Sequence, residues 1–178
     1  MLVTWLVLLA SQFGMVIAQN GECAKAVEIG SLPVKANGNT LVTDLHLDLP
    51  AEACGLVKGM RRSSWFSYVA QSAGCLTAKA SVVDDPTTQE DKGFDTAIAV
   101  YSGNCTDLSC VAMNDDENLF NVNSVVHVDV TAGTSYKIMV TGWNTEVKGA
   151  FELDIEVGYG SIIQITGQKK LTIPTAKR

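Results

Sequence analysis

Carboxylates gather at both ends of one stretch of the chain, GFDTAIAVYSGNCTDLSCVAMNDDE, which covers residues 93–117. Two alternating runs flank a short turn within it, and this pattern is typical of a β-hairpin. If the hairpin is centred on residues 103–108, Asp95 lies opposite Asp116, with Asp115 beside it. Like charges that face each other across a sheet destabilise it, so the pattern calls for a compensating partner.

A calcium ion would supply that compensation, because it binds six to eight oxygens from carboxylates, amides and carbonyls. The expected ligands are Asp95, Asn114, Asp115 and Asp116, with Asp84 and Asp85 reaching across from the preceding segment. The alternative is that these Asp and Asn side chains only end strands and form turns. In a second register, with Cys105 facing Cys110, Asp95 would face Phe120 and lie near the acids without contacting them. No calcium loop of the EF-hand type is present in the sequence.

Catalytic chemistry is weakly represented. The two histidines, His46 and His127, both fall in strand-like runs, where a solvated face of a sheet explains them. The sequence contains no nucleophile elbow, zinc-protease or phosphate-loop motif. A glycosidase with paired carboxylates remains an alternative, but acids in loops more often solubilise a protein or bind metal. We therefore expect a protein without enzymatic activity.

Two surface residues point to binding and modification. Trp143 lies in TGWNTEVKG, a turn between two strands, where an exposed indole can stack on a sugar or anchor a protein. The alternative is that it covers the open end of a core. Asn104 begins the sequon Asn-Cys-Thr, which a eukaryotic secretory pathway could glycosylate. Its middle residue, Cys105, is also a candidate for a disulfide, and the two modifications would compete.

The first eighteen residues read as a secretory signal peptide. They are uncharged and largely apolar, and Val16-Ile17-Ala18 provides a cleavage site. No later run reaches the ~18 to 20 apolar residues of a membrane helix, so we expect a soluble, secreted protein. Residues 161–178 carry four basic and no acidic side chains. We expect them to form a basic tail, with an extra strand at its start and a flexible end, after a single domain that spans residues 19–160.

Export makes disulfides the natural interpretation of the five cysteines. Cys105 and Cys110 flank a four-residue turn, which favours a bridge between them, and Cys23 would then pair with Cys54. Cys75 is left as the odd thiol, either half-buried and inert or available for a disulfide-linked dimer.

The net charge of −6 excludes a basic nucleic-acid-binding footprint.

The remaining pattern is all-β. About eight or nine short runs of alternating or β-branched residues are separated by turn residues, as in ANGNT and DDPTTQEDKG. This spacing predicts an antiparallel β-sandwich and not a set of βαβ units. The segment AEACGLVKGM is expected to form one short helical turn.

The ordered segments also carry a family resemblance. From WFSYVA through FDTAIAVYSGNC, LSCVAMNDD, TAGTSYKIMVTG and GAFELDI, over about residues 23–157, the chain resembles the bacterial pre-peptidase C-terminal domain family. The resemblance implies a jelly-roll-like sandwich that is secreted and attached to a protease or another polymer-degrading enzyme. Some relatives bind calcium, and some bind insoluble polymers such as collagen or chitin. A CUB-like domain, another secreted sandwich with an acidic calcium site, is the nearest competitor.

Two functions follow from these observations. The first is a secreted binding module for an extracellular polymer, either polysaccharide or protein, or for a surface protein, with calcium as a structural aid. The second is a domain that assists the maturation or export of a secreted hydrolase; a CUB-like protein-interaction module is a further alternative. A stable mature chain would favour the first, and a chain found only in precursors would favour the second.

Overall fold

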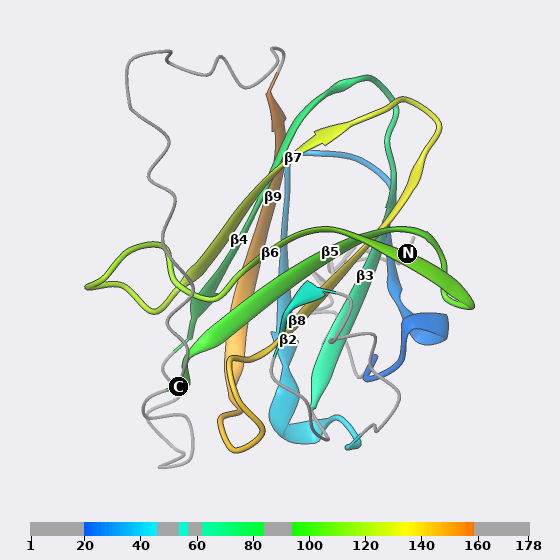
Figure 1. Ribbon diagram of the computed structural model, residues 1–178. Helices are drawn as coiled ribbons and strands as arrows, with labels where there is room; N and C mark the ends of the chain where they lie inside the picture. Colours follow the sequence, from blue (N-terminus) through cyan, green and yellow to red (C-terminus); the bar gives the residue numbers. More distant parts are fainter. Residues whose placement is uncertain (1–19, 46–53, 57–61, 84–93, 159–178) are drawn as a thin grey trace, which may run out of the picture.

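The computed structural model describes residues 20–45, 54–56, 62–83 and 94–158. The expected signal peptide, the basic tail, His46 and the candidate ligands Asp84 and Asp85 lie outside these ranges. Within them, nine strands form two sheets packed face to face, so the predicted β-sandwich is confirmed (Figure 1). None of the helices in the described part is long and apolar enough to cross a membrane.

The first sheet has five strands in the order β1-β3-β8-β5-β6. Its members are β1 (Val27–Ile29), β3 (Ser63–Val69), β8 (Ser135–Gly142), β5 (Thr96–Asn104) and β6 (Asp107–Asn114). The second sheet has the order β2-β9-β4-β7. Its members are β2 (Val34–Asn39), β9 (Ala150–Gly158), β4 (Gly74–Val82) and β7 (Ser124–Val130). The strand pairs are antiparallel except β1 with β3, which is parallel. A parallel neighbour requires a long crossover, and here the chain passes through the other sheet between the two strands.

The main core lies between the sheets. Alternate residues of each strand point inward, and the largest fully buried ones include Phe66, Ile98, Leu76, Phe151 and Ile155. Phe66 from the first sheet and Phe151 from the second meet edge to face, with ring centroids 6.3 Å apart. This period-two burial is the physical basis of the alternation seen in the sequence.

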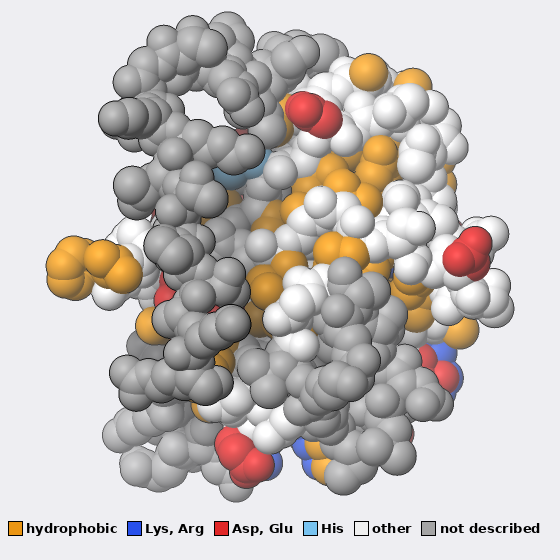
Figure 2. All heavy atoms as spheres, viewed as in Figure 1, with side chains coloured by type: hydrophobic (Ala, Val, Ile, Leu, Met, Phe, Trp, Pro, Cys, Tyr) orange, Lys and Arg blue, Asp and Glu red, His pale blue; other side chains and the backbone are white. Residues whose placement is uncertain are grey.

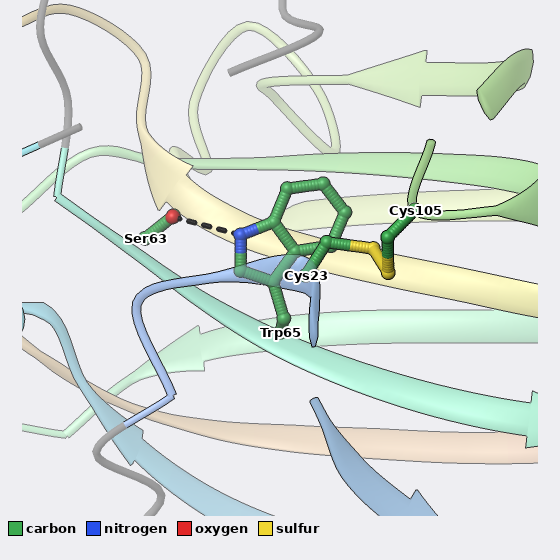
Figure 3. Close-up of a disulfide and its surroundings, with 4 residues drawn as sticks. All are labelled: Cys23, Ser63, Trp65 and Cys105. Carbon is green, nitrogen blue, oxygen red and sulfur yellow. Dashed lines mark hydrogen bonds between the residues drawn. A yellow bond between two sulfur atoms is a disulfide. The ribbon is translucent and has the colours of Figure 1, made fainter. Parts of the chain in front are cut away.

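A second, smaller core covers the outer face of the first sheet. It contains Trp65, Ala97, Ala99, Tyr101 and Met139, covered by Cys54 and Leu56 and flanked by Cys23 and Ala26. Because both of its faces are covered, β5 is buried at every position from Thr96 to Tyr101. Trp65 stacks on Tyr101 at 5.8 Å, and its indole N–H donates to the Ser63 hydroxyl at 3.0 Å (Figure 3).

The predicted disulfide pairing is wrong, although the four cysteines are the predicted ones. Cys23 bonds to Cys105 (Figure 3), and Cys54 bonds to Cys110. Cys105 lies in the hairpin turn, whereas Cys110 pairs with Tyr101 along the strand. The three residue steps from Asp107 to Cys110 span about 10 Å of strand. Cys110 is therefore too far from the turn for a bridge to Cys105. Cys75 is the free cysteine, as predicted.

The start of the second sheet also differs from the sequence prediction. Residues 37–39, expected to form a turn within ANGNT, belong to β2, and a 3₁₀ turn, η2 (Thr40–Val42), follows them. Gly38 pairs with Phe151, and a Cβ at Gly38 would lie 2.2 Å from Cζ of that ring. The glycine is therefore present because an aromatic ring lies against the strand, and not because the chain turns. Of the predicted short helical segment, only Cys54 to Leu56 is described, and it begins with a helical residue.

Candidate functional site

The candidate site lies at the end of the sandwich where β5 begins and where β6 and β8 end. Buried hydroxyls join these strands: Thr96 Oγ1 contacts Ser124 Oγ at 2.6 Å, and Ser124 Oγ donates to the Asp115 carbonyl at 3.2 Å. The backbone N–H of Trp143 donates to the Asp95 carbonyl at 3.0 Å. These bonds fix the backbones that carry Asp95, Asp115 and Trp143 relative to one another.

The hairpin register is close to the first of the two predicted ones. Asn104 pairs with Asp107 at the turn, and the pairing continues to Tyr101 with Cys110. A bulge between Val100 and Tyr101 then shifts the register by one residue, so that the last pair is Ile98 with Asn114. A bulge of this kind could not be located from the alternation, because both strands keep their apolar character across it.

Asp95 lies beyond that last pair, close to the two predicted acids. Burial, followed by the negative charges of Asp116 and Asp115, raises the pKa of the Asp95 carboxyl to about 6. Its Oδ1 atom is buried and has no hydrogen-bond partner. Asp115 and Asp116 are exposed, and Asn114 is half-buried at the end of β6. The sequence therefore predicted the approach of these carboxylates and the register on the turn side of the bulge, but not the bulge itself.

The oxygen atoms of Asp95, Asp115 and Asp116 are the possible ligands of a cation at this end of the sandwich. An acceptor atom that is buried without a donor is the kind of group that a cation or a proton stabilises. Among the residues that the structure describes, no three His, Cys, Asp or Glu side chains are close enough together to hold a metal ion. Asp95, Asp115 and Asp116 carry carboxylate oxygens of the kind that calcium binds, but these side chains do not by themselves form a metal site in the described part of the chain, so any site would need further amide or backbone oxygens.

Trp143 lies at the same end, on the loop between β8 and β9. Its side chain is 41% exposed. The loop is held by Asn144, whose Oδ1 accepts from the backbone N–H groups of Glu146 and Val147 at 2.8 and 3.0 Å. Gly142 allows the close return of the loop, since a Cβ there would lie 2.2 Å from the Val147 carbonyl oxygen. The indole is therefore presented by a short, well-bonded turn.

The same loop borders a cavity of about 380 Å³. Its described lining combines apolar, hydroxyl and charged groups: Leu45, Arg62, Thr145, Glu146, Val147 and Lys148. Arg62 is fixed by the Leu41 carbonyl, to which it donates at 3.3 Å, and by the Thr43 carbonyl. This cavity could not be predicted from the sequence, because its described lining comes from three separate segments that carry no shared motif.

The remaining predicted residues lie elsewhere. His127 is on the outer face of the second sheet, where its Nδ1 lies 3.0 Å from the Thr77 hydroxyl. Cys75 lies on the same sheet, and burial, with the nearby charge of Asp129, raises the pKa of its thiol. Asn104 is exposed at the far end of β5, next to the bonded Cys105.

Comparison with known proteins gives likenesses in structure only. No protein-family model and no curated protein matches the sequence. The chain is similar to the pre-peptidase C-terminal domain of a Bacillus anthracis collagenase, with 14% identity, 74% of this chain and 94% of that chain covered, and a TM-score of 0.46. It is also similar to PliG from Aeromonas hydrophila, a periplasmic inhibitor of g-type lysozyme, with 11% identity, 75% and 96% covered, and a TM-score of 0.46.

One of these two structures is a pre-peptidase C-terminal domain, which is the family that the sequence resembles. At these identities the likeness concerns the fold alone. The two disulfides agree with an oxidising, extracytoplasmic location.

Proposed function

We propose that this protein is a secreted, non-catalytic binding module for an extracellular polymer, and that Trp143 forms the centre of its binding surface. The observation that supports this proposal is the exposed indole of Trp143 on a turn fixed by Asn144, together with a cavity of mixed polarity that the following residues of the same loop line. Ligand sites typically combine an apolar contact surface with a few polar groups that set orientation.

Among polymers, a polysaccharide suits this surface best. A flat indole stacks on the apolar face of a sugar ring, and hydroxyl and charged side chains bind the ring's hydroxyl groups. Thr145, Glu146 and Arg62 supply such groups in the lining of the cavity. Arg62 is already fixed by two backbone carbonyls, so it would lose little conformational freedom on binding.

The test is sedimentation of the mature protein with insoluble polysaccharides, namely chitin, cellulose and peptidoglycan, and with collagen as the protein polymer. We expect retention on at least one polysaccharide, loss of retention in Trp143→Ala, and partial recovery in Trp143→Phe. Val69→Ala is a matched control, because Val69 is 56% exposed at the opposite end of the sandwich. Equal retention of wild type and Trp143→Ala would refute the assignment, and retention on collagen alone would replace polysaccharide with protein.

Calcium is proposed as a structural aid to this end of the molecule. Asp95 would contribute its partnerless Oδ1, and Asp115 and Asp116 would contribute exposed carboxylates. A bound cation would remove the repulsion among the three and would stabilise only the folded state, by about 2.7 kcal/mol at a hundred times Kd.

Calcium at millimolar concentration should therefore raise the melting temperature, and a chelator should reverse the effect. The response should disappear in Asp95→Asn, and magnesium should produce less of it because it keeps its water shell. Sodium chloride at matched ionic strength is the control for simple screening. If sodium chloride reproduces the shift, the acids form a charged surface without a metal site.

A further inference from the structure

The loop between β6 and β7 presents two large apolar side chains to solvent. Leu119 is 94% exposed and Phe120 is 96% exposed, whereas the next most exposed large apolar residue in the described ranges, Val69, is at 56%. The loop projects from the body of the sandwich in Figure 1, and apolar side chains stand alone at the corresponding edge in Figure 2. Nothing in the fold requires them to be apolar, because they contribute to neither core.

The loop that carries them is held in one shape. Asn118 and Asn121 exchange backbone hydrogen bonds across the two-residue turn, at 3.4 and 3.1 Å. The Asn118 side chain accepts from the Phe120 N–H at 3.0 Å. At the base of the loop, Glu117 accepts from the Asn121 amide at 2.7 Å and forms an ion pair with Lys79 at 2.9 Å.

Such an arrangement suits binding more than stability. Exposed Leu and Phe side chains do not stabilise the isolated fold, but a turn that is already ordered loses little entropy when it docks. Aromatic side chains that enter a pocket are also the usual anchors of protein interfaces. The remaining question is what kind of surface receives them.

The charges around the loop distinguish a membrane from a protein as the surface that receives Leu119 and Phe120. Residues 114–124 contain three acids, Asp115, Asp116 and Glu117, and no Lys or Arg. Glu117 is paired with Lys79, so the exposed Asp115 and Asp116 carry the negative charge of the loop. An anionic membrane would repel this segment, and two side chains bury less hydrocarbon than a single acyl chain, which itself gives only marginal membrane binding. A protein pocket with a basic rim would bind the apolar tip and the acidic base together, and only such a pocket would benefit from a rigid turn.

We propose that Leu119 and Phe120 form an anchor that enters an apolar pocket on a second, folded protein, and that Lys or Arg side chains line the rim of that pocket. This contact is separate from the polymer surface around Trp143, which lies on a different loop. It would let the module join a polymer and a protein at once.

The experiment begins with a photo-crosslinking phenylalanine analogue at position 120, in the full chain secreted by its own cells. The same analogue at position 69 is the control. A protein crosslinked from position 120 and not from position 69 is then purified, and its affinity for the wild type, Phe120→Asp, Leu119→Asp and Val69→Asp is measured by calorimetry. Circular dichroism checks that each variant remains folded, which is expected because all three side chains are exposed.

We expect Phe120→Asp to weaken binding by about 30-fold or more, as for an interface anchor. Leu119→Asp should also weaken binding, while Val69→Asp should leave it within about twofold. Raising salt from 50 to 500 mM should weaken binding of the wild type, because the rim contact is ionic. The proposal is overturned if position 120 captures nothing beyond the control, or if the affinity is insensitive to Phe120→Asp or to salt. It is also overturned if Phe120→Asp instead abolishes self-association in sedimentation, or abolishes binding to phosphatidylcholine or phosphatidylglycerol vesicles, because the receiving surface is then a second copy or a lipid.

Discussion

The Asp95 carboxyl should make the stability of the fold depend on pH. Its pKa in the folded protein is about 6, against an ordinary value of 3.8. Below pH 3.8 the group is protonated in both the folded and the unfolded chain, and it does not lower the free energy of unfolding. Between these two values the unfolded chain releases the proton first, so folding becomes less favourable as the pH rises, and above about pH 6 the cost is constant.

The size of the cost follows from the shift. A pKa difference of about two units corresponds to about 3 kcal/mol. Asp95 is only half-buried, and solvent screening reduces that ceiling to about 1–2 kcal/mol. Asp95→Asn keeps the shape of the side chain and removes the charge, and the amide can donate to the neighbouring carboxylates. It should therefore stabilise the protein by that amount at pH 7.5 and by almost nothing at pH 3.5.

The assay is urea unfolding, followed by circular dichroism, in chelator-treated buffer at pH 3.5, 5, 6 and 7.5. Asp107→Asn is the control, since Asp107 is an exposed acid at the opposite end of the same hairpin, and its effect should stay within about 0.5 kcal/mol at every pH. A stabilisation by Asp95→Asn that does not change with pH would refute the electrostatic reasoning. A destabilisation at pH 7.5 would show that the ionised carboxylate has a favourable partner.

Three further predictions concern the scaffold. Peptide mapping of the non-reduced mature protein should find Cys23 bonded to Cys105 and Cys54 bonded to Cys110, with one free thiol per chain. A peptide in which Cys105 is bonded to Cys110 would contradict the register of the hairpin. Gly38→Ala should lower the free energy of unfolding by about 1–3 kcal/mol, because the new methyl group would overlap the Phe151 ring. Gly30→Ala should not lower it, because nothing lies within 4 Å of a Cβ at that position. Equal losses of stability in the two variants would exclude the clash. Phe66→Ala should lower the free energy of unfolding, measured by chemical denaturation, by about 3–5 kcal/mol, because Phe66 is 0% exposed. Phe120→Ala should hardly change it, because Phe120 is 96% exposed. Similar losses would mean that the loop between β6 and β7 is part of the core.

Much of the fold could be predicted from the sequence because the information is local. Alternation in runs such as DTAIAVYS reflects one buried face per strand, and the sandwich follows from many such runs separated by turns. The approach of Asp95 to Asp115 and Asp116 could also be predicted, because a hairpin brings together residues that are equally distant from its turn. Even a bulge of one residue did not separate them.

The cysteine pairing depends on contacts that no local pattern contains. Cys23 and Cys54 come from segments that cover the outer face of the first sheet, and their partners lie on β5–β6 because Trp65, Tyr101 and Met139 make that face apolar. The sequence shows β5 as an apolar run, but it does not show which segment covers its second face. The cavity lined by Arg62 and Thr145 could not be predicted for the same reason, since its lining is assembled from distant parts of the chain.

The β5–β6 hairpin connects the two disulfides to the proposed binding features. Cys105 anchors its turn, and Cys110 anchors β6 on the turn side of the bulge. Beyond the bulge, the same strand leads to Asp115 and then to the loop that carries Phe120. An edge strand such as β6 has a neighbour on only one side, so its register is held less firmly than that of a central strand. The bridge at Cys110 compensates for this, because a slip of β6 by one residue would turn the cysteine away from Cys54 and would also move Asp115 and Phe120. The positions of Asp115 and Phe120 therefore depend on the disulfide between Cys54 and Cys110, which lies on the other side of the bulge.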